Sequence, residues 1–488
     1  MPVDAENRSW PRLSPLVYFS NNWISLIGVV VVTTATIFWL FLLPTTVQGQ
    51  ASAPYIGILA FLVVPAAFFA GLALIPLGIA IQRKKEGRRG IYPSSFPPLT
   101  WQNREFRRLV YFVGLTTFAN LVVASQATYG AVNYMDSVTF CGQTCHNVMQ
   151  PEYTAFQVSP HARLECVQCH IGPGASWFVR SKLTGVGQVF AVAFHTYPTP
   201  IPTPVQNLRP ARETCETCHW PEVFGQDRVE VLWKFADDEK NTLTKTVLLM
   251  KIGGGNQGIG IHGTHLGRGV RILYTPTDPS RQTISRVEYT AGGKTTVYAA
   301  SDPPAKGSPQ PPRVMDCMDC HNRPSHNFQL PERAVDNAMQ AGDISPSLPF
   351  AKKESVALLK ANYATRQEAA QRIPEEFEQF YRAQYPAVYT QQDGAVRNSA
   401  RQVLAIYDRN IFPAMKVTWG TYPNDLGHMD FPGCFRCHDG GHSTKDGSKA
   451  ITNDCNACHN LLAVDEANPK ILGDLGIVEK VPAAVSRQ

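Results

Sequence analysis

The chain has 488 residues, a net charge of +6, 12 cysteines and 13 histidines. This length allows two or three domains with a sizeable core, and twelve cysteines are too many to be incidental but too few for a small scaffold held together by disulfides. The mean hydropathy of −0.15 hides an uneven distribution. Long uncharged stretches lie near the N-terminus, and every cysteine lies after residue 140.

Three apolar stretches precede the first cysteine. Residues 24–43 and 55–81 contain no charged residue, which fits the hydrocarbon core of a bilayer. The third stretch, 109–132, is weaker because it contains Asn120, Ser125 and Gln126. We expect three transmembrane helices within residues 24–132, after a tail of residues 1–23. We expect no cleaved signal peptide, since the first stretch starts late and lacks a small-residue cleavage site.

The loops between these stretches predict their orientation. Residues 82–108 carry eight Lys and Arg against two Glu, whereas the loop 44–54 carries no charge. Basic loops stay in the cytoplasm. We therefore expect a bacterial inner-membrane protein with a cytoplasmic N-terminus and a periplasmic part after residue 132. The alternative of a nucleic-acid patch is disfavoured by the position of the loop between two spans, so no nucleic acid is expected as a partner.

The twelve cysteines form six pairs, and a histidine directly follows each pair. Five pairs read C-x-x-C-H, the attachment signature of c-type haem, and the first pair has one extra spacer residue. Two thiols bond to the two vinyl groups of one porphyrin, and the histidine lies under the iron as its proximal ligand. Zinc ribbons and thioredoxin-like motifs require no histidine at this position. We therefore expect six covalently attached haem c groups. The thioether pairs are Cys141 with Cys145, Cys166 with Cys169, Cys215 with Cys218, Cys317 with Cys320, Cys434 with Cys437, and Cys455 with Cys458; the proximal histidines are His146, His170, His219, His321, His438 and His459.

Six irons need a second axial ligand each, and seven histidines remain. One histidine is therefore spare even if all six irons are bis-histidine ligated. Met149, three residues after His146, is a further candidate for the first iron, and a thioether there would raise its potential. His326 and His442 follow a motif histidine too closely to fold back easily onto the same iron, so we expect them to serve neighbouring haems. The candidates for the second position are Met149, His161, His195, His262, His265, His326, His428 and His442.

Residues 140–226 resemble the NapC/NirT family of membrane-anchored, quinol-oxidising cytochromes c. The matching features are an apolar helix before the first motif, Met149 after it, Ser159-Pro160-His161 before the second motif, and Lys182. The resemblance implies a quinol site beside the first haem. It also implies that Met149 takes part in the ligation of that haem, that Lys182 lines the quinol site, and that His161 ligates another haem.

The chain departs from that family in several places. The first motif has an extra spacer, and Met149 comes one residue later than usual. The family's acidic residue after the lysine is missing, because residues 185–193 contain no carboxylate, and Gln188 is the nearest polar candidate. Three spans followed by further haems resemble the larger inner-membrane cytochromes of metal-respiring bacteria. The implied partners are the quinone pool, a periplasmic cytochrome or reductase as electron acceptor, and other subunits of a membrane complex.

The sequence after the membrane spans divides into five segments. We expect haems 1–3 in residues 133–226, a β-rich insert in 227–300, a linker in 301–312, haems 4–6 in 313–464 and a tail in 465–488. Strands are expected at 229–235, 246–252, 270–274, 285–289 and 295–298. Helices are expected at 352–372, ending before Pro374, and around 396–407, as a cap on the haem cluster. The fold class is thus three transmembrane α-helices plus a periplasmic, mainly α and irregular, haem-packed domain with a β-rich insert.

A glycine-rich stretch, 253–260, lies inside the predicted insert. It lacks the Gly-Lys-Ser/Thr of a phosphate-binding loop, and no helix is expected after it. We therefore favour a loop that carries the ligand candidates His262 and His265.

These features favour a membrane-anchored quinol dehydrogenase that oxidises quinol, with menaquinol as the expected type, and passes electrons along its haems. An electron-relay subunit without its own quinol site is the main alternative, favoured by the altered first motif and the missing carboxylate. A terminal reductase needs an open iron position, which the number of histidines disfavours. A haem-based sensor is disfavoured because no signalling domain follows the spans.

Overall fold

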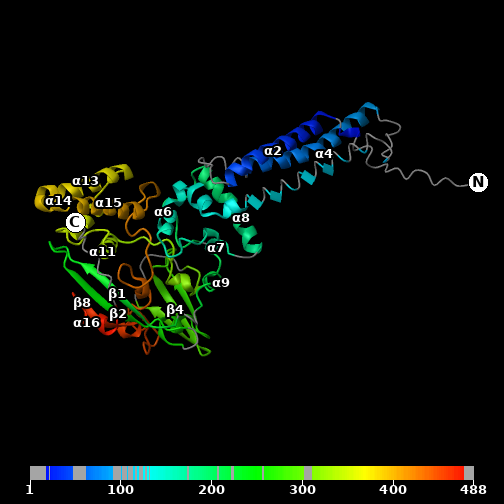
Figure 1. Cartoon of the computed structure of the whole chain (residues 1–488). Helices are drawn as coiled ribbons and strands as arrows, with labels where there is room; N and C mark the ends of the chain where they lie inside the picture. The colour runs from blue at the N-terminus through cyan, green and yellow to red at the C-terminus, as the bar shows by residue number, and fades with distance from the viewer. Residues whose placement is uncertain are drawn as a thin grey trace, which may run out of the picture. The chain divides into compact units, whose positions relative to one another are not determined.

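The computed structural model describes residues 18–20, 22–47, 62–91, 101, 132–144, 146–172, 175–205, 208–220, 225–254, 258–301 and 310–477, with isolated positions between 107 and 130. The chain divides into two compact units, Met1–Thr144 and Cys145–Gln488. Figure 1 labels the helices and strands of both units.

Two helices, α2 (Trp23–Val47) and α4 (Val64–Arg89), pack against each other in the first unit. Small residues bring them close together. A methyl group added to Gly28 would lie 2.8 Å from the Gly71 carbonyl oxygen, and Ser25 Oγ donates to the Ile75 carbonyl at 3.0 Å. Membrane helices commonly associate through such small side chains.

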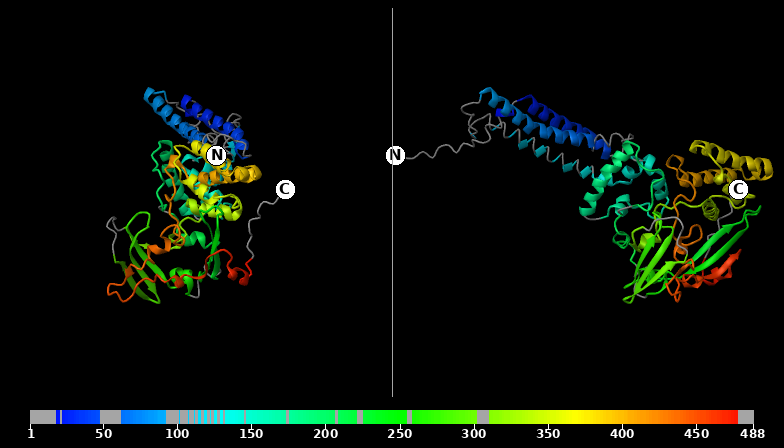
Figure 2. Two further views of the ribbon diagram at one scale, coloured as in Figure 1. Left: turned by 90° about the vertical axis from the view of Figure 1, so that its left-hand side faces the viewer. Right: turned by 180° about the vertical axis from the view of Figure 1, so that it is seen from behind.

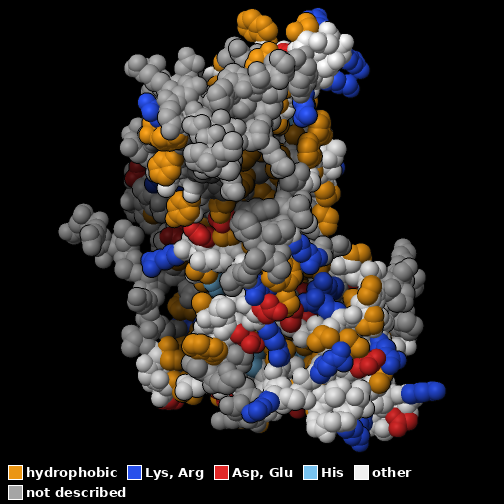
Figure 3. Space-filling model, turned by 90° about the vertical axis from the view of Figure 1, so that its right-hand side faces the viewer, with side chains coloured by type: hydrophobic (Ala, Val, Ile, Leu, Met, Phe, Trp, Pro, Cys, Tyr) orange, Lys and Arg blue, Asp and Glu red, His pale blue; other side chains and the backbone are white. Residues whose placement is uncertain are grey.

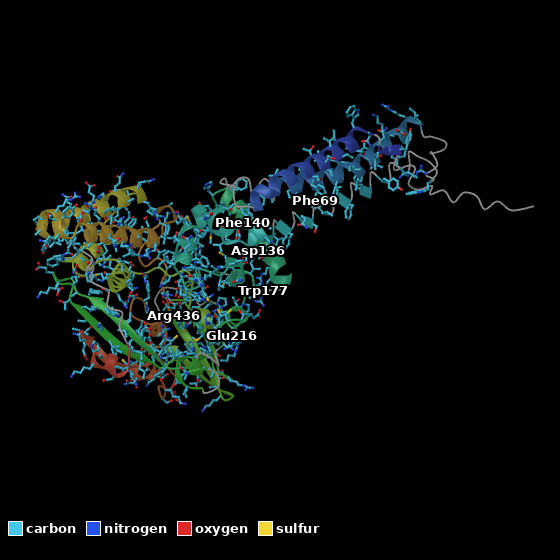
Figure 4. The ribbon with its side chains drawn as sticks, viewed as in Figure 1. Phe69, Asp136, Phe140, Trp177, Glu216 and Arg436 are labelled. Atoms are coloured by element: carbon cyan, nitrogen blue, oxygen red, sulfur yellow. The ribbon has the colours of Figure 1, made fainter. Side chains whose placement is uncertain are left out.

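Helix α4 is, among the described residues, the one helix that is both long and apolar enough to cross a membrane. Phe68 on α4 is buried, whereas its neighbour Phe69 is exposed and projects from the helix (Figure 4). Exposed apolar side chains along such a helix suit contact with lipid. The apolar part of α2, Trp23–Thr36, is shorter, and most of the predicted third span, 109–132, lies outside the described residues.

Two antiparallel sheets form part of the second unit. The first has the order β1-β2-β8, and the second has the order β6-β3-β4-β5-β7. β6, β7 and β8 come from residues after 312, so the strands between residues 228 and 300 share their sheets with the C-terminal part of the chain. The strands are β1 (Arg228–Phe235), β2 (Leu243–Met250), β3 (Arg271–Pro276), β4 (Ile284–Ala291), β5 (Lys294–Ala300), β6 (Arg313–Val314), β7 (His442–Ser443) and β8 (His459–Glu466).

Five helices form a separate layer of the second unit, and Figures 1 and 2 both show them on the side away from the five-stranded sheet. The largest hydrophobic core of the described residues joins these helices to Trp233 and Phe235 of β1. Buried Asn241 connects the two layers, since its side chain donates to the Leu348 carbonyl at 2.7 Å and accepts from Lys352 N at 2.9 Å. The helices are α11 (Pro331–Ala341), α12 (Ala351–Lys360), α13 (Arg366–Gln384), α14 (Pro386–Gln391) and α15 (Asp393–Asn410).

The expected single helix at 352–372 is wrong, because α12 and α13 are two helices. The Thr365 side chain accepts a hydrogen bond from Glu368 N at 3.1 Å and so starts a new helix, as N-cap residues do. The expected end before Pro374 is also wrong, because α13 continues to Gln384. Ile373 and Phe377 on either side of this proline are fully buried, and this packing outweighs the backbone hydrogen bond that proline cannot make.

Short helices occupy much of the remainder. A seven-residue helix, α10, follows the glycine-rich stretch, so the expectation of no helix there is wrong. A methyl group on Gly253 would lie 1.9 Å from the Ile259 carbonyl oxygen, and Gly253 has a φ of +58°. Only glycine fits both constraints. The short helices are α6 (His146–Gln157), α7 (Cys166–His170), α9 (Ala211–Cys215), α10 (Gly260–Leu266) and α16 (Lys470–Asp474), and a longer helix, α8 (Ala175–Ala193), lies among them in the chain.

Candidate functional site

The cysteine motifs lie in single turns of helix. Cys166 to His170 form α7, Cys215 ends α9, and the last three motifs begin in 3-10 turns. In the third, fourth and fifth motifs the histidine N–H donates to the carbonyl of the first cysteine, at 2.8, 2.8 and 3.0 Å. In these three motifs one turn therefore places both thiols and the histidine together, as attachment of one porphyrin requires.

The first motif has a wider turn. Residues Phe140–Thr144 form a π-helical turn, which holds one more residue per turn than an α-helix. This geometry accommodates the third spacer residue. Cys145 and the His146 side chain lie outside the described residues.

Neither disulfides nor a zinc-type cluster explain these cysteines. Among the described residues, none of the eleven cysteines forms a disulfide. Within those same parts of the chain, no three or more Cys, His, Asp or Glu side chains converge on a point that could hold a metal ion. The described cysteines thus remain available for attachment to a prosthetic group.

Five motif histidines each face one of the remaining histidines. Their ring centres are 5.8–6.4 Å apart. A metal–imidazole bond is about 2 Å long and the ring centre lies about 1 Å beyond the nitrogen, so two axial imidazoles on one iron have centres about 6 Å apart. The residues thus fit a haem iron between the rings of each pair. The pairs are His170 with His326, His219 with His161, His321 with His262, His438 with His265, and His459 with His428.

Hydrogen bonds orient several of these rings. Nδ1 of His265 lies 2.8 Å from the Ile261 carbonyl oxygen, and Nδ1 of His326 lies 3.0 Å from that of Glu152. His438 and His161 make the same kind of contact, at 2.6 and 3.3 Å. When Nδ1 donates to a carbonyl, Nε2 is left as the ligand. Burial also lowers the pKa of His262 and His265, which favours the neutral form that binds metals.

Helix α10 holds two of the partner histidines. His262 and His265 lie three residues apart, so both project from a similar face of the helix. His262 faces the fourth motif and His265 faces the fifth. One short helix therefore serves two neighbouring motifs.

Contacts between motifs give them an order in space. Helix α7 contacts α9, and α9 contacts the turn at Cys317, whose thiol is hydrogen-bonded to Cys215. Arg436 in the spacer of the fifth motif (Figure 4) donates to the Asp319 carbonyl in the spacer of the fourth. Burial raises the pKa of Cys458 in the sixth motif, and the nearby Cys434 thiol of the fifth adds to this. Motifs two to six thus follow one another in space as they do in sequence.

Two of the predicted ligand histidines face no motif histidine that the structure describes. His442 is 1% exposed, and its ring nitrogens lie 3.0 Å from Asp439 Oδ1 and 3.0 Å from the Ile284 carbonyl oxygen. His195 is exposed, has a φ of +55° and lies beside Tyr197. Figure 3 shows histidine side chains only as small patches set back among other side chains on the face it draws.

The residues predicted for a quinol site lie on α6 and α8. Met149 of α6 packs, partly buried, against a cluster that includes Phe412 and Met415. Helix α8 carries Lys182, whose side chain lies outside the described part, and Gln188, which is exposed. Trp177 of α8 (Figure 4) lies under the Arg180 guanidinium, 5.3 Å from its ring centre.

The sequence predicts every paired histidine as a ligand. It does not predict which two histidines pair, or which groups orient their rings. The carbonyls of Glu152, Ile261 and Thr452 carry no signal in the sequence, because any residue supplies a carbonyl. The contact between Arg436 and Asp319 also joins residues that are far apart in the chain.

Comparisons with known proteins agree with the geometry. The model of the NapC/NirT cytochrome c family, N-terminal region, matches residues 104–203. The chain is 40% identical over 451 residues to cytochrome c-type protein ImcH of Geobacter sulfurreducens. The aligned residues make up 90% of this chain and 88% of that protein. No solved structure matches the chain.

Proposed function

This chain belongs to the NapC/NirT cytochrome c family, and from that premise we propose that it is a hexahaem quinol dehydrogenase of the bacterial inner membrane. Membership makes it a membrane-anchored c-type cytochrome of electron transfer with covalently bound haem. The proposal adds three spans, a periplasmic haem-binding part and oxidation of quinol, with menaquinol as the expected type.

The five histidine pairs carry the proposal. Each pair joins a motif histidine to a second histidine at the separation that one iron requires. Five haems are therefore assigned bis-histidine ligation. For the first haem, His146 is the proximal ligand, and Met149 and His195 are the candidates for its second ligand. His442 is left out, because hydrogen bonds occupy both of its ring nitrogens.

The order of the motifs supports a linear path for electrons. Haem supplies reversible one-electron chemistry, and the protein sets the potential of each iron through its ligands, hydrogen bonds and burial. The contacts from α7 through α9 to Cys317, and from Arg436 to Asp319, hold neighbouring attachment turns together. We expect electrons to enter near the first motif and leave near the sixth for a periplasmic cytochrome or reductase.

The quinol site is proposed beside the first motif, on α8. Oxidation of one quinol releases two electrons and two protons. Lys182 would bind a quinol oxygen and so orient the ring. Gln188, exposed on the same helix, can hydrogen-bond to quinol but cannot accept its proton, so the protons pass to water on the periplasmic side.

Reduction by a quinol analogue tests this function. Full-length protein in detergent should be reduced by a menaquinol analogue, and Lys182→Leu should slow this reduction at least about tenfold, as expected for the loss of a hydrogen bond to a charged group. Reduction by dithionite should not change, and Lys240→Leu, at an exposed turn, should behave like the parent.

Two results would contradict it. Equal slowing of the quinol and dithionite reactions in Lys182→Leu would remove this residue from the site. If the parent protein fails to accept electrons from quinol with all haems intact, the alternative of an electron-relay subunit is favoured. The absence of a carboxylate in residues 185–193 also supports that alternative.

A further inference from the structure

Arg323 is a buried cation, and one of its two terminal guanidinium nitrogens makes no hydrogen bond to the described residues. Its side chain is 7% exposed. Nη1 lies 3.3 and 3.4 Å from the two Glu152 carboxylate oxygens, and the guanidinium lies 4.1 Å from the centre of the Tyr422 ring. Nη2 is buried and has no hydrogen-bond partner among the described residues.

Arg323 lies between ligands of two different irons. It follows His321 by two residues and precedes His326 by three. Glu152 also contacts His326, because its carbonyl oxygen lies 3.0 Å from His326 Nδ1. The Glu152–Arg323 ion pair is therefore in contact, through Glu152, with His326, whose ring faces His170.

A buried N–H of a guanidinium without an acceptor is strongly unfavourable. Asp425, a buried carboxylate of the same unit, does not supply the acceptor, because it pairs with Arg436 at 3.1 Å. A planar guanidinium is best matched by a carboxylate. Haem carries two propionate carboxylates, and the pair of His170 and His326 fits one haem.

We propose that Nη2 of Arg323 binds a propionate of the haem held between His170 and His326, and that Arg323 and Glu152 set the potential of this haem in opposite directions. The inference rests on the proposed haem assignment. Reduction removes one positive charge from the haem, so the Arg323 cation stabilises the reduced state and raises the potential, while the Glu152 carboxylate lowers it.

Potentiometric titration of purified full-length variants tests this inference. The signal of this haem is identified as the one that moves upward in His326→Met, since a thioether ligand raises the potential. We expect Arg323→Gln to lower the midpoint potential of that component and Glu152→Gln to raise it. Arg323→Lys keeps the charge and should give a smaller fall. Arg397→Gln removes an exposed arginine that pairs with Asp393 and should move no component.

The outcomes separate the two levels of the proposal. Midpoint shifts of the same sign in Arg323→Gln and Glu152→Gln, or no shift with six haems retained, would overturn the role of Arg323. A shift confined to another haem would do the same. Fewer than six haems in the parent protein, or no change of any haem signal in His326→Met, would overturn the haem assignment on which the inference rests. If Arg323→Gln fails to fold, Arg323→Lys and Glu152→Gln still decide the sign.

Discussion

At the scale of single residues, the contacts of the ring nitrogens distinguish histidines arranged as haem ligands from histidines bonded within the protein. A histidine whose Nδ1 meets a backbone carbonyl and whose ring faces a motif histidine is arranged as a ligand, as His265 is. His442 instead has both nitrogens engaged within the protein. The sequence could predict the set of candidates but not this division, because the acceptors are main-chain carbonyls and one carboxylate.

Replacing His265 and His442 should therefore have different effects. His265→Met changes one ligand of the haem assigned to the fifth motif and should raise the potential of one component in a redox titration. His442→Asn leaves buried partners imperfectly paired and should lower the stability by about 1–3 kcal/mol, with all potentials unchanged. Thermal unfolding measures the second effect. A shift of a haem potential in His442→Asn would contradict the division.

At the scale of elements, the sequence predicts the haem-attachment turns better than it predicts the helix boundaries. The C-x-x-C-H spacing implies a single turn, and five motifs lie in such turns. The break between α12 and α13 depends on Thr365 as an N-cap, a signal that the sequence does contain. The passage of α13 through Pro374 depends on tertiary burial, which no local pattern reports. The pairing of β8 with β2 is likewise a long-range contact.

The loop before α10 gives a prediction at this scale. Gly253→Ala would place a methyl group against the Ile259 carbonyl, and the strain of roughly 1–3 kcal/mol expected for such a backbone position should displace α10. Since α10 carries His262 and His265, two low-spin haem signals should change together in electron paramagnetic resonance spectra. Gly473→Ala, whose added methyl group meets nothing within 4 Å, is the control. A change of a single haem signal would show that the two ligands are positioned independently.

At the scale of the whole molecule, two units with different surfaces are joined in one chain. The first has exposed apolar residues along a long helix, and the second has charged residues of both signs close together on the face drawn in Figure 3. The predicted resemblance to the NapC/NirT family is confirmed by the family match and by the identity to ImcH. The three-span count stays a prediction, since most of residues 109–132 lie outside the described part.

The basic end of α4 should determine the orientation of the chain. Replacing its five Lys and Arg residues by Gln weakens the signal that keeps this loop in the cytoplasm. Because c-type haem is attached outside the cytoplasm, we expect the haem content of membranes to fall severalfold, as measured by pyridine haemochrome spectra. Unchanged haem content would contradict the assigned topology. The replaced residues are Arg83, Lys84, Lys85, Arg88 and Arg89, and the control replaces Arg228, Lys234, Lys240, Lys294 and Lys449 of the second unit.

We propose that the five histidine pairs are the axial ligands of five haems. Near-infrared magnetic circular dichroism of the oxidised, full-length protein tests it most directly, because bis-histidine and histidine–methionine haems give different charge-transfer bands. With six haems counted by haemochrome analysis, we expect bis-histidine intensity for at least five of them. Bis-histidine intensity for fewer than five haems, or high-spin haem at more than one site, would contradict it.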